Sequence, residues 1–372
     1  MNEPAGSKAV SRASASLPPP ITMMNRRQLA LVVAGSLLLS VFFFAPRLWL
    51  MREYVAGSFQ WNRAHTFLLQ CEQPFRTDVE IAMRWRLLPP LVAHCGGLSG
   101  RAPLVLPWLG VLGLLGYAAV LHARRLPDRK FVFGGTLLVA TTSAVLVPVG
   151  WLGINDAWVW IGLLAVAFGR APWALPLACV LCPWIDERFI VGLPLAWMVR
   201  CLDENIPFWS RRLAASGWLI PYVATRLAFG TDPANNTASS VFLTTQLHTV
   251  NVFLPMAPLG WWMGLRAGWF GTGYAAYSVP AGRRCAAAVV LGATLAASLF
   301  LASDISRSVA IVLPAVLLGG FMLARRDPER APMILLCAGC ANLVVPAAHV
   351  ILTHLDPINP LPVEIFRLLR SR

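Results

Sequence analysis

The sequence predicts an all-α membrane protein, a polytopic transmembrane bundle of about eleven helices with a long first external loop of interfacial helices. Two observations support this prediction. Of the 372 residues, 57% are hydrophobic and only 13% are charged, whereas a soluble globular domain carries roughly 25% charged residues. The apolar residues also gather in runs close to the roughly 20 residues that cross a bilayer. Because backbone groups in lipid must be hydrogen-bonded within each segment, these runs predict helices.

The apolar runs divide the chain into a tail, a transmembrane domain and a second tail. The clearest runs are Leu29–Ala45, Leu104–Val120, Phe131–Val149, Ala286–Ala302, Val309–Ala324 and Met333–Leu352. Residues 1–24 are rich in Ser, Ala and Pro, and we expect a disordered cytoplasmic tail there. The transmembrane domain then covers residues 25–355, with the first external loop at 47–101, and residues 356–372 form a short external tail.

The net charge of +14 predicts orientation in a membrane. It does not indicate a nucleic-acid partner, because the arginines lie at the ends of apolar runs, without a basic stripe or stacking aromatic residues. Arginine-rich loops face the cytoplasm in membrane proteins. A cytoplasmic N-terminus places on the inside the groups Arg124-Arg125, Arg211-Arg212, Arg266 with Arg283-Arg284, and Arg325-Arg326. We therefore expect a multi-pass membrane protein with a cytoplasmic N-terminus and an external C-terminus.

One segment decides this orientation. Trp173–Val199 is apolar but is interrupted by Asp186-Glu187-Arg188. A single helix would place three charges at the membrane centre, which is costly. A hairpin of two short helices avoids that cost and keeps the later arginine-rich loops inside. We expect the hairpin, with a single span as the alternative.

Acidic and basic residues recur on the external side of this topology. The group comprises Asp78 and Glu80 in the first loop, Asp156, Asp186, Glu187 and Asp304, with Arg86, Arg188 and Arg307 beside them. Several have a structural explanation, since Asp156 suits a helix cap and Asp304 suits a cap with a local ion pair to Arg307. We expect His248 and His349 to be packing residues. The recurrence of both signs on one face nevertheless predicts an external polar cavity.

The first external loop mixes aromatic and aliphatic residues with arginines between Arg47 and Arg101. That composition predicts amphipathic helices lying in the membrane interface. Asp78 and Glu80 are two residues apart, so on a helix they would point about 200° from each other. At most one of the two carboxylates is expected to serve a given site.

Four short segments resemble the GT-C superfamily of membrane glycosyltransferases, which use sugars carried on polyprenyl phosphate. They are Arg86-Leu87-Leu88-Pro89-Pro90, Asn155-Asp156, Asp186-Glu187-Arg188 and Asp304-Ile305-Ser306-Arg307. These segments resemble those of bacterial members, which implies the bacterial inner (plasma) membrane as the location. The long first external loop is similar to that of the superfamily. Two features depart from the family. The acids of the first loop are separated in Asp78-Val79-Glu80, and we expect no external C-terminal domain of the kind that some branches carry.

The resemblance implies inverting transfer of a sugar from a polyprenyl-phosphate donor to a lipid, glycan or protein acceptor at the external membrane face. Asp78, or else Glu80, would be the general base. The departing phosphate would be held by Arg307, Arg188 and Arg86. The remaining acids, Asp156, Asp186, Glu187 and Asp304, would line the acceptor cavity. No cofactor is required, although Asp78 with Asp186 or Glu187 would suit a divalent cation if they converge.

Two other classes of membrane protein compete with this interpretation. A secondary transporter or a flippase for lipid-linked sugars would place ionisable groups in mid-membrane and show paired broken helices. A polysaccharide polymerase is the third hypothesis, and it would carry a large external loop late in the chain. The identities of the sugar and the acceptor are not encoded in any motif that we recognise.

Overall fold

The computed structural model describes residues 24–48, 59–79, 81–204, 206, 211–229, 250–252, 254–301, 304–351 and 353–370. Helices make up most of this part, in agreement with the predicted all-α class. The expected tail at 1–24 falls almost entirely outside the described residues, as do Glu80 and His248.

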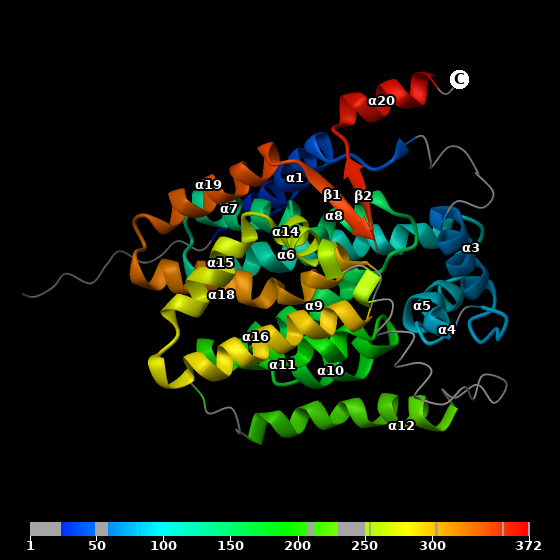
Figure 1. Cartoon of the computed structure of the whole chain (residues 1–372), viewed down its shortest axis with the longest axis horizontal. Coiled ribbons are helices and arrows are strands. Elements are labelled where there is room, and N and C mark those ends of the chain that lie inside the picture. The colour runs from blue at the N-terminus through cyan, green and yellow to red at the C-terminus, as the bar shows by residue number, and fades with distance from the viewer. Residues whose placement is uncertain are drawn as a thin grey trace, which may run out of the picture.

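The helices form an elongated bundle. The first half of the chain contains α1 (Arg26–Phe43), α3 (Phe59–Glu72), α4 (Ile81–Arg84), α5 (Leu88–Cys95), η1 (Ala102–Leu104), α6 (Val105–Arg125), α7 (Arg129–Ala140), α8 (Ser143–Gly150), α9 (Asp156–Phe168), α10 (Ala174–Leu181) and η2 (Cys182–Trp184). The second half contains α11 (Arg188–Asp203), η3 (Arg211–Leu219), α12 (Ile220–Phe229), η5 (Leu254–Met256), α14 (Ala257–Leu265), α15 (Gly268–Ser278), α16 (Ala281–Leu301), α17 (Ile305–Ser308), η6 (Val309–Val312), α18 (Leu313–Arg326), α19 (Ala331–Val344), β1 (Ala347–Ile351), β2 (His354–Ile358) and α20 (Leu361–Arg370). Figure 1 shows α3, α4 and α5 grouped at one end and α20 standing apart from the bundle.

Four helical segments of the described chain are long and apolar enough to cross a membrane. They are Arg26–Phe43, Ala102–Arg125, Ala281–Leu299 and Ile305–Arg326, and the bent pair of α7 and α8 makes a fifth if it is one span. Other apolar helices, such as α9, are shorter. These helices support a membrane-spanning protein, whereas the expected eleven spans are not reached among the described helices.

The core lies around α9, α11 and α18. The segment Ile305–Arg326 is 94% buried, whereas only 17% of α1 and of α16 is buried. Trp160 of α9 and Trp197 of α11 are among the largest side chains that are fully enclosed. Charged helix ends on α9, α11 and α17 are therefore held by the most rigid part of the bundle, whereas α1 and α16 form its periphery.

Glycines bring two helix pairs into backbone contact. A Cβ added to Gly319 of α18 would lie 1.8 Å from the carbonyl oxygen of Gly271 in α15. A Cβ added to Gly134 of α7 would lie 2.4 Å from the backbone nitrogen of Leu336 in α19. Small residues allow such close approach between membrane helices, where dispersion contacts contribute strongly to association.

The chain reverses direction at Asp186-Glu187-Arg188, as the hairpin prediction requires. At one end of the pair α9 and α11, Arg188 Nη1 lies 3.6 Å from Asp156 Oδ2. At the other end, the Arg200 guanidinium donates to the backbone carbonyl of Gly169. Residues expected on one membrane face thus lie together at one end of these helices.

Two helix pairs are broken near the middle of the bundle. Helices α7 and α8 meet at an angle of 53°, and α14 gives way to α15 at Arg266, whose φ is 47°. Asn342 of α19 bridges the two breaks. Its Nδ2 donates to Thr141 Oγ1 at 3.1 Å, and its Oδ1 accepts from the backbone N–H of Ala267 at 2.7 Å.

The position of Arg266 differs from our expectation of an inside loop shared with Arg283. Its side chain is fully buried at the break between α14 and α15. Nη1 donates to the carbonyls of Asn342 and Val345 at 2.9 and 3.0 Å, so Arg266 caps the C-terminus of α19. The sequence could not reveal this, because a positively charged residue after an apolar run is also the usual signal for a cytoplasmic loop.

The C-terminal region also departs from the prediction of one helix over Met333–Leu352. Helix α19 ends at Val344, and β1 pairs with β2 in an antiparallel hairpin in which Ala347 lies opposite Ile358. Pro346 has no backbone N–H for a helical hydrogen bond, which explains why the helix does not continue through it. The predicted external tail contains part of β2 and helix α20.

Candidate functional site

Three helix starts and one segment of the first loop meet at a cluster of buried charges. Asp156 opens α9, Arg188 opens α11 and Arg307 lies in the short helix α17. The turn before α9 requires Gly153, whose φ is +75°, a backbone conformation that glycine adopts without steric cost. A Cβ there would also lie 3.4 Å from the Phe67 side chain of α3, so this turn is where the first loop touches the bundle.

Arg307 and Asp156 form the central ion pair. Arg307 Nη2 donates to Asp156 Oδ1 at 2.6 Å, and Arg307 Nε donates to the other carboxylate oxygen. The side chains are only 3% and 4% exposed. A guanidinium that donates in parallel to both carboxylate oxygens is fixed in orientation as well as neutralised. The pair therefore joins the start of α9 to α17.

Arg188 and Asp186 complete the part of the cluster that the hairpin provides. Asp186 Oδ1 accepts from the backbone N–H of Arg188 at 2.9 Å, and Asp186 Oδ2 accepts from Arg188 Nη1 at 3.0 Å. Arg188 Nε donates to Ser308 Oγ at 3.1 Å. Asp186 thus neutralises Arg188 and also holds the turn of the hairpin in place.

The described part of the first loop covers this cluster with two further arginines. Arg86 Nη2 lies 3.1 Å from Asp186 Oδ2. The Nε atoms of Arg86 and Arg63 are buried and have no hydrogen-bond partner within the described part of the chain. Both residues line a cavity of about 20 Å³ together with Asp156, Asp186 and Arg307. Such a cavity has room for about one water molecule.

The described residues of the cluster carry an excess of positive charge. Four guanidinium groups, those of Arg63, Arg86, Arg188 and Arg307, meet three carboxylates, those of Asp156, Asp186 and Asp304. Buried cations without a partner are costly. Together with the two buried Nε atoms that lack partners, this excess favours an anion as the ligand of the cluster.

Asp304 is oriented by a chain of hydrogen bonds from the C-terminal hairpin. Ser306 Oγ accepts from the backbone N–H of Val350 at 2.9 Å, so its own proton can be donated to His349 Nδ1, also at 2.9 Å. A ring that accepts at Nδ1 carries its hydrogen on Nε2, and Nε2 lies 3.1 Å from Asp304 Oδ2. His349 is therefore a polar link between β1 and the cluster, although the sequence indicated only a packing residue.

Six of the nine residues singled out from the sequence come together here: Arg86, Arg188, Arg307, Asp156, Asp186 and Asp304. Glu187 instead pairs with Arg226 Nη2 at 2.7 Å and is about one-third exposed. Asp78 is 65% exposed and accepts from both Arg76 Nε and Nη2 at 2.6 Å. It is not among the residues that line the cavity. The Arg76 hydrogen bonds lower the pKa of Asp78 to about 2. Glu80 lies outside the described residues.

Arg63 is the cluster residue that sequence reasoning missed. It was one of several arginines in the first loop, and periodicity in a short interfacial helix does not show which face turns toward the bundle. Its position one turn before Phe67, which contacts the Gly153 turn, is a signal that can be interpreted only once that contact is known. Among the described residues, no group of three His, Cys, Asp or Glu side chains is arranged to hold a metal ion.

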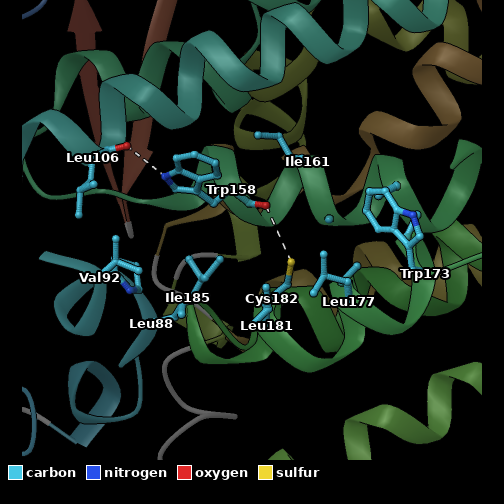
Figure 2. Close-up of a pocket in the computed structure, with 15 residues that line it drawn as sticks. Leu88, Val92, Leu106, Trp158, Ile161, Trp173, Leu177, Leu181, Cys182 and Ile185 are labelled. Carbon is cyan, nitrogen blue, oxygen red and sulfur yellow. Dashed lines mark hydrogen bonds between the residues drawn. The ribbon is translucent and has the colours of Figure 1, made fainter. Parts of the chain in front are cut away.

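An apolar groove of about 450 Å³ begins beside the cluster. Figure 2 shows Leu88 and Val92 at one end and Trp173 at the other, with Trp158 and Leu177 between them. The groove shares Pro89 and Ile185 with the lining of the charged cavity. Trp158 Nε1 donates to the Leu106 carbonyl at 3.0 Å, so this indole offers the groove an apolar face. The arrangement can receive an amphipathic molecule with an anionic head and a hydrocarbon tail.

Comparisons of the chain with protein-family models, with curated proteins and with solved structures find no match.

Proposed function

We propose that this protein is a membrane glycosyltransferase of the GT-C type, which transfers a sugar from a polyprenyl-phosphate donor to an acceptor at the external membrane face. One observation carries the proposal. An apolar groove of about 450 Å³ ends at a buried cluster whose described residues include more arginines than carboxylates. The resemblance of the four short segments to that superfamily adds the class of reaction.

The donor would lie with its polyprenyl tail in the groove and its phosphate toward Arg86. Arg86 and Arg63 are the natural first contacts, because each has a buried Nε without a partner in the described chain. Arg188 and Arg307 are held by aspartates and would add positive charge that stabilises the departing polyprenyl phosphate. No covalent intermediate on the protein is required for a transfer that inverts the anomeric centre.

Entry of the donor phosphate requires the first loop to open. The cavity of about 20 Å³ holds roughly one water, which is far smaller than a sugar phosphate. Its outer wall is made by α3, by Met83 at the end of α4, and by Pro89 and Pro90 of α5. These pieces are tied to one another, since Gln70 Nε2 donates to the Met83 carbonyl at 3.0 Å. We propose that they lift as one unit.

Asp78 remains our proposed general base, with Glu80 as the second candidate. It would take the proton of the acceptor hydroxyl while that oxygen attacks the anomeric carbon and the bond to the phosphate oxygen breaks. Arg76 holds both oxygens of Asp78 in the closed arrangement. Opening of the first loop would therefore have to separate Arg76 from Asp78 before the carboxylate can act.

Binding of undecaprenyl phosphate to the purified full chain tests the head and the tail of the proposed site separately. Arg86→Gln removes a guanidinium donor and should weaken binding about tenfold, the scale of a charge-assisted hydrogen bond. Ala165→Phe places an aromatic ring on a groove-lining position and should weaken undecaprenyl phosphate strongly while leaving inorganic phosphate unaffected.

The matched controls are the same kinds of substitution at positions that do not line the charged cavity or the apolar groove. Arg84→Gln removes a neighbouring charge that does not line the cavity, and Ala286→Phe adds the same ring to an exposed face of α16. Unchanged binding in both test variants, or equal losses in test and control variants, would contradict the proposal.

A flippase for lipid-linked sugars is the second candidate, because the broken pairs α7–α8 and α14–α15 face each other through Asn342. Transporters use such discontinuous helices at the membrane midplane. Reconstituted protein distinguishes the two. A transferase produces a glycosylated acceptor without moving the donor between leaflets, whereas a flippase moves the donor and forms no new glycosidic bond.

A further inference from the structure

A second cavity lies at the opposite end of α9 and α11 from the charged cluster. Its volume is about 510 Å³, and its lining consists of Gly169, Arg170, Ala171, Pro172, Leu175, Arg200, Glu204 and Ala215. Both helices start in the cluster and end here. The two cavities are therefore separate, and this one belongs to the end that the arginine distribution assigns to the cytoplasm.

The cavity carries a net positive charge. Arg200 is buried, donates to the Gly169 carbonyl, and has its Nε 3.2 Å from Glu204 Oε1. Arg170 is exposed, and no described residue provides it with a carboxylate partner. Two guanidinium groups thus face one carboxylate, and the Arg170 guanidinium is available to a ligand. A phosphate group suits this arrangement, because guanidinium donors bind phosphate in pairs.

The surroundings favour a phosphate that belongs to a lipid. Pro172, Leu175 and Ala215 give the cavity an apolar wall. Trp173 follows Pro172 in the sequence and Trp218 lies three residues after Ala215. They are 65% and 55% exposed, as is typical of tryptophans at the level of the headgroups. The apolar groove reaches Trp173 and Ala174, which lie between Pro172 and Leu175 in the sequence. An acyl chain could leave the cavity along that groove.

We propose that this cavity binds the headgroup of an anionic phospholipid, with its phosphate at Arg170 and Arg200 and an acyl chain beside Trp173. Basic pockets between helices at the cytoplasmic end of membrane proteins are suited to such headgroups. Lipid binding at this cavity does not require the protein to be a glycosyltransferase.

Lipid binding to the purified full chain tests the proposal directly. Phosphatidylglycerol and phosphatidylcholine with the same acyl chains are titrated separately, and native mass spectrometry counts the bound lipids. Phosphatidylglycerol should bind several-fold more tightly. Arg170→Gln should reduce that preference about fivefold, the effect expected for one arginine near an anionic headgroup. Arg170 has no carboxylate partner in the described chain, so this variant should fold.

Arg326→Gln is the matched control, because it removes an exposed arginine from the same end without touching the cavity. Equal affinity for the two lipids, or equal effects of Arg170→Gln and Arg326→Gln, would overturn the proposal. Displacement of phosphatidylglycerol by millimolar inorganic phosphate would also overturn it, because the apolar wall would then contribute nothing to binding. Retention in the presence of phosphate supports the lipid assignment.

Discussion

At the scale of single residues, the arginines of the cluster differ in how many hydrogen-bond and ion-pair partners they have. Arg307 is held by both oxygens of Asp156, and Arg188 by Asp186 and Ser308. Arg86 has one carboxylate partner and one buried nitrogen without a partner. The fixed arginines therefore act mainly on the fold, and Arg86 is the better position at which to perturb binding alone.

The Asp156–Arg307 pair makes a prediction about stability. Arg307→Met leaves a buried carboxylate without its main partner and should cost about 3–5 kcal/mol. Adding Asp156→Leu removes that carboxylate and should recover most of the loss. Thermal unfolding of the detergent-solubilised protein measures both effects.

The pair of Arg226 with Glu187 is the comparison for this stability prediction. It is about one-third exposed on each side, so Arg226→Met should cost about 0–1 kcal/mol. Equal losses for Arg226→Met and Arg307→Met would show that the buried pair has no special importance for stability.

Asp78 makes a prediction about pH. Its pKa of about 2 lies below the ordinary aspartate value of 3.8, so the pairing with Arg76 is fully present above pH 3.8 and is lost as the pH falls toward 2. If Asp78 is the base, the transfer rate has no acid limb from this residue between pH 5 and 8. Asp78→Asn should lower the rate about 100-fold. Arg76→Gln should raise the pKa of Asp78 and move its acid limb upward.

The neighbouring acid provides the control for the Asp78 experiment. Glu80→Gln should have a smaller effect, because Asp78 and not Glu80 is the proposed base. A normal rate in Asp78→Asn with an inactive Glu80→Gln would move the base to Glu80. Full activity of both variants in a verified transfer assay would exclude a base in this part of the first loop.

At the scale of elements, the sequence predicts which charged residues at helix ends lie on the same face of the bundle. Asp156, Arg188 and Arg307 each lie at or near the start of a helix. Counting the apolar runs between them places all three on one face, and the structure brings them together. The same reasoning does not place Arg266, because Arg266 donates to the backbone carbonyls of Asn342 and Val345 at the end of the distant helix α19. Asp78 escapes it because a loop gives no periodicity from which the direction of a side chain follows.

The hairpin β1–β2 is likewise beyond what apolar periodicity can show. The residues of β1 are mostly apolar, like those of α19, so the sequence pattern does not separate the strand from the helix. Only Pro346 indicates the end of that helix. The contact of His349 with Asp304 joins this strand to α17. Residues far apart in the sequence are thus brought to one site by a contact between β1 and α17, which the sequence alone does not show.

At the scale of the whole molecule, the opposite ends of the bundle carry different charge patterns. Arg125 and Arg325 both contact Asp203 at one end, and the cluster around Asp156 occupies the other. The arginine distribution predicts that the Asp203 end faces the cytoplasm.

Labelling of single cysteines tests this orientation. In a background without native cysteines, cysteines at Ala123 and Asp327 should resist an impermeant thiol reagent added from outside, because both positions adjoin arginine-rich groups. A cysteine at Ser99, in the exposed first loop, should react and shows that the reagent works. Reaction at Asp327 without reaction at Ala123 would show that the two positions lie on opposite sides of the membrane.

The closed cavity beneath α3, α4 and α5 has a kinetic consequence. A ligand that needs this cavity can enter only during the fraction of time in which the first loop is lifted, so its apparent affinity falls by that same fraction. The association rate then ceases to rise with ligand concentration once it equals the frequency of opening. The first loop, and not the chemistry at the arginines, would set the upper limit on how often the protein can work.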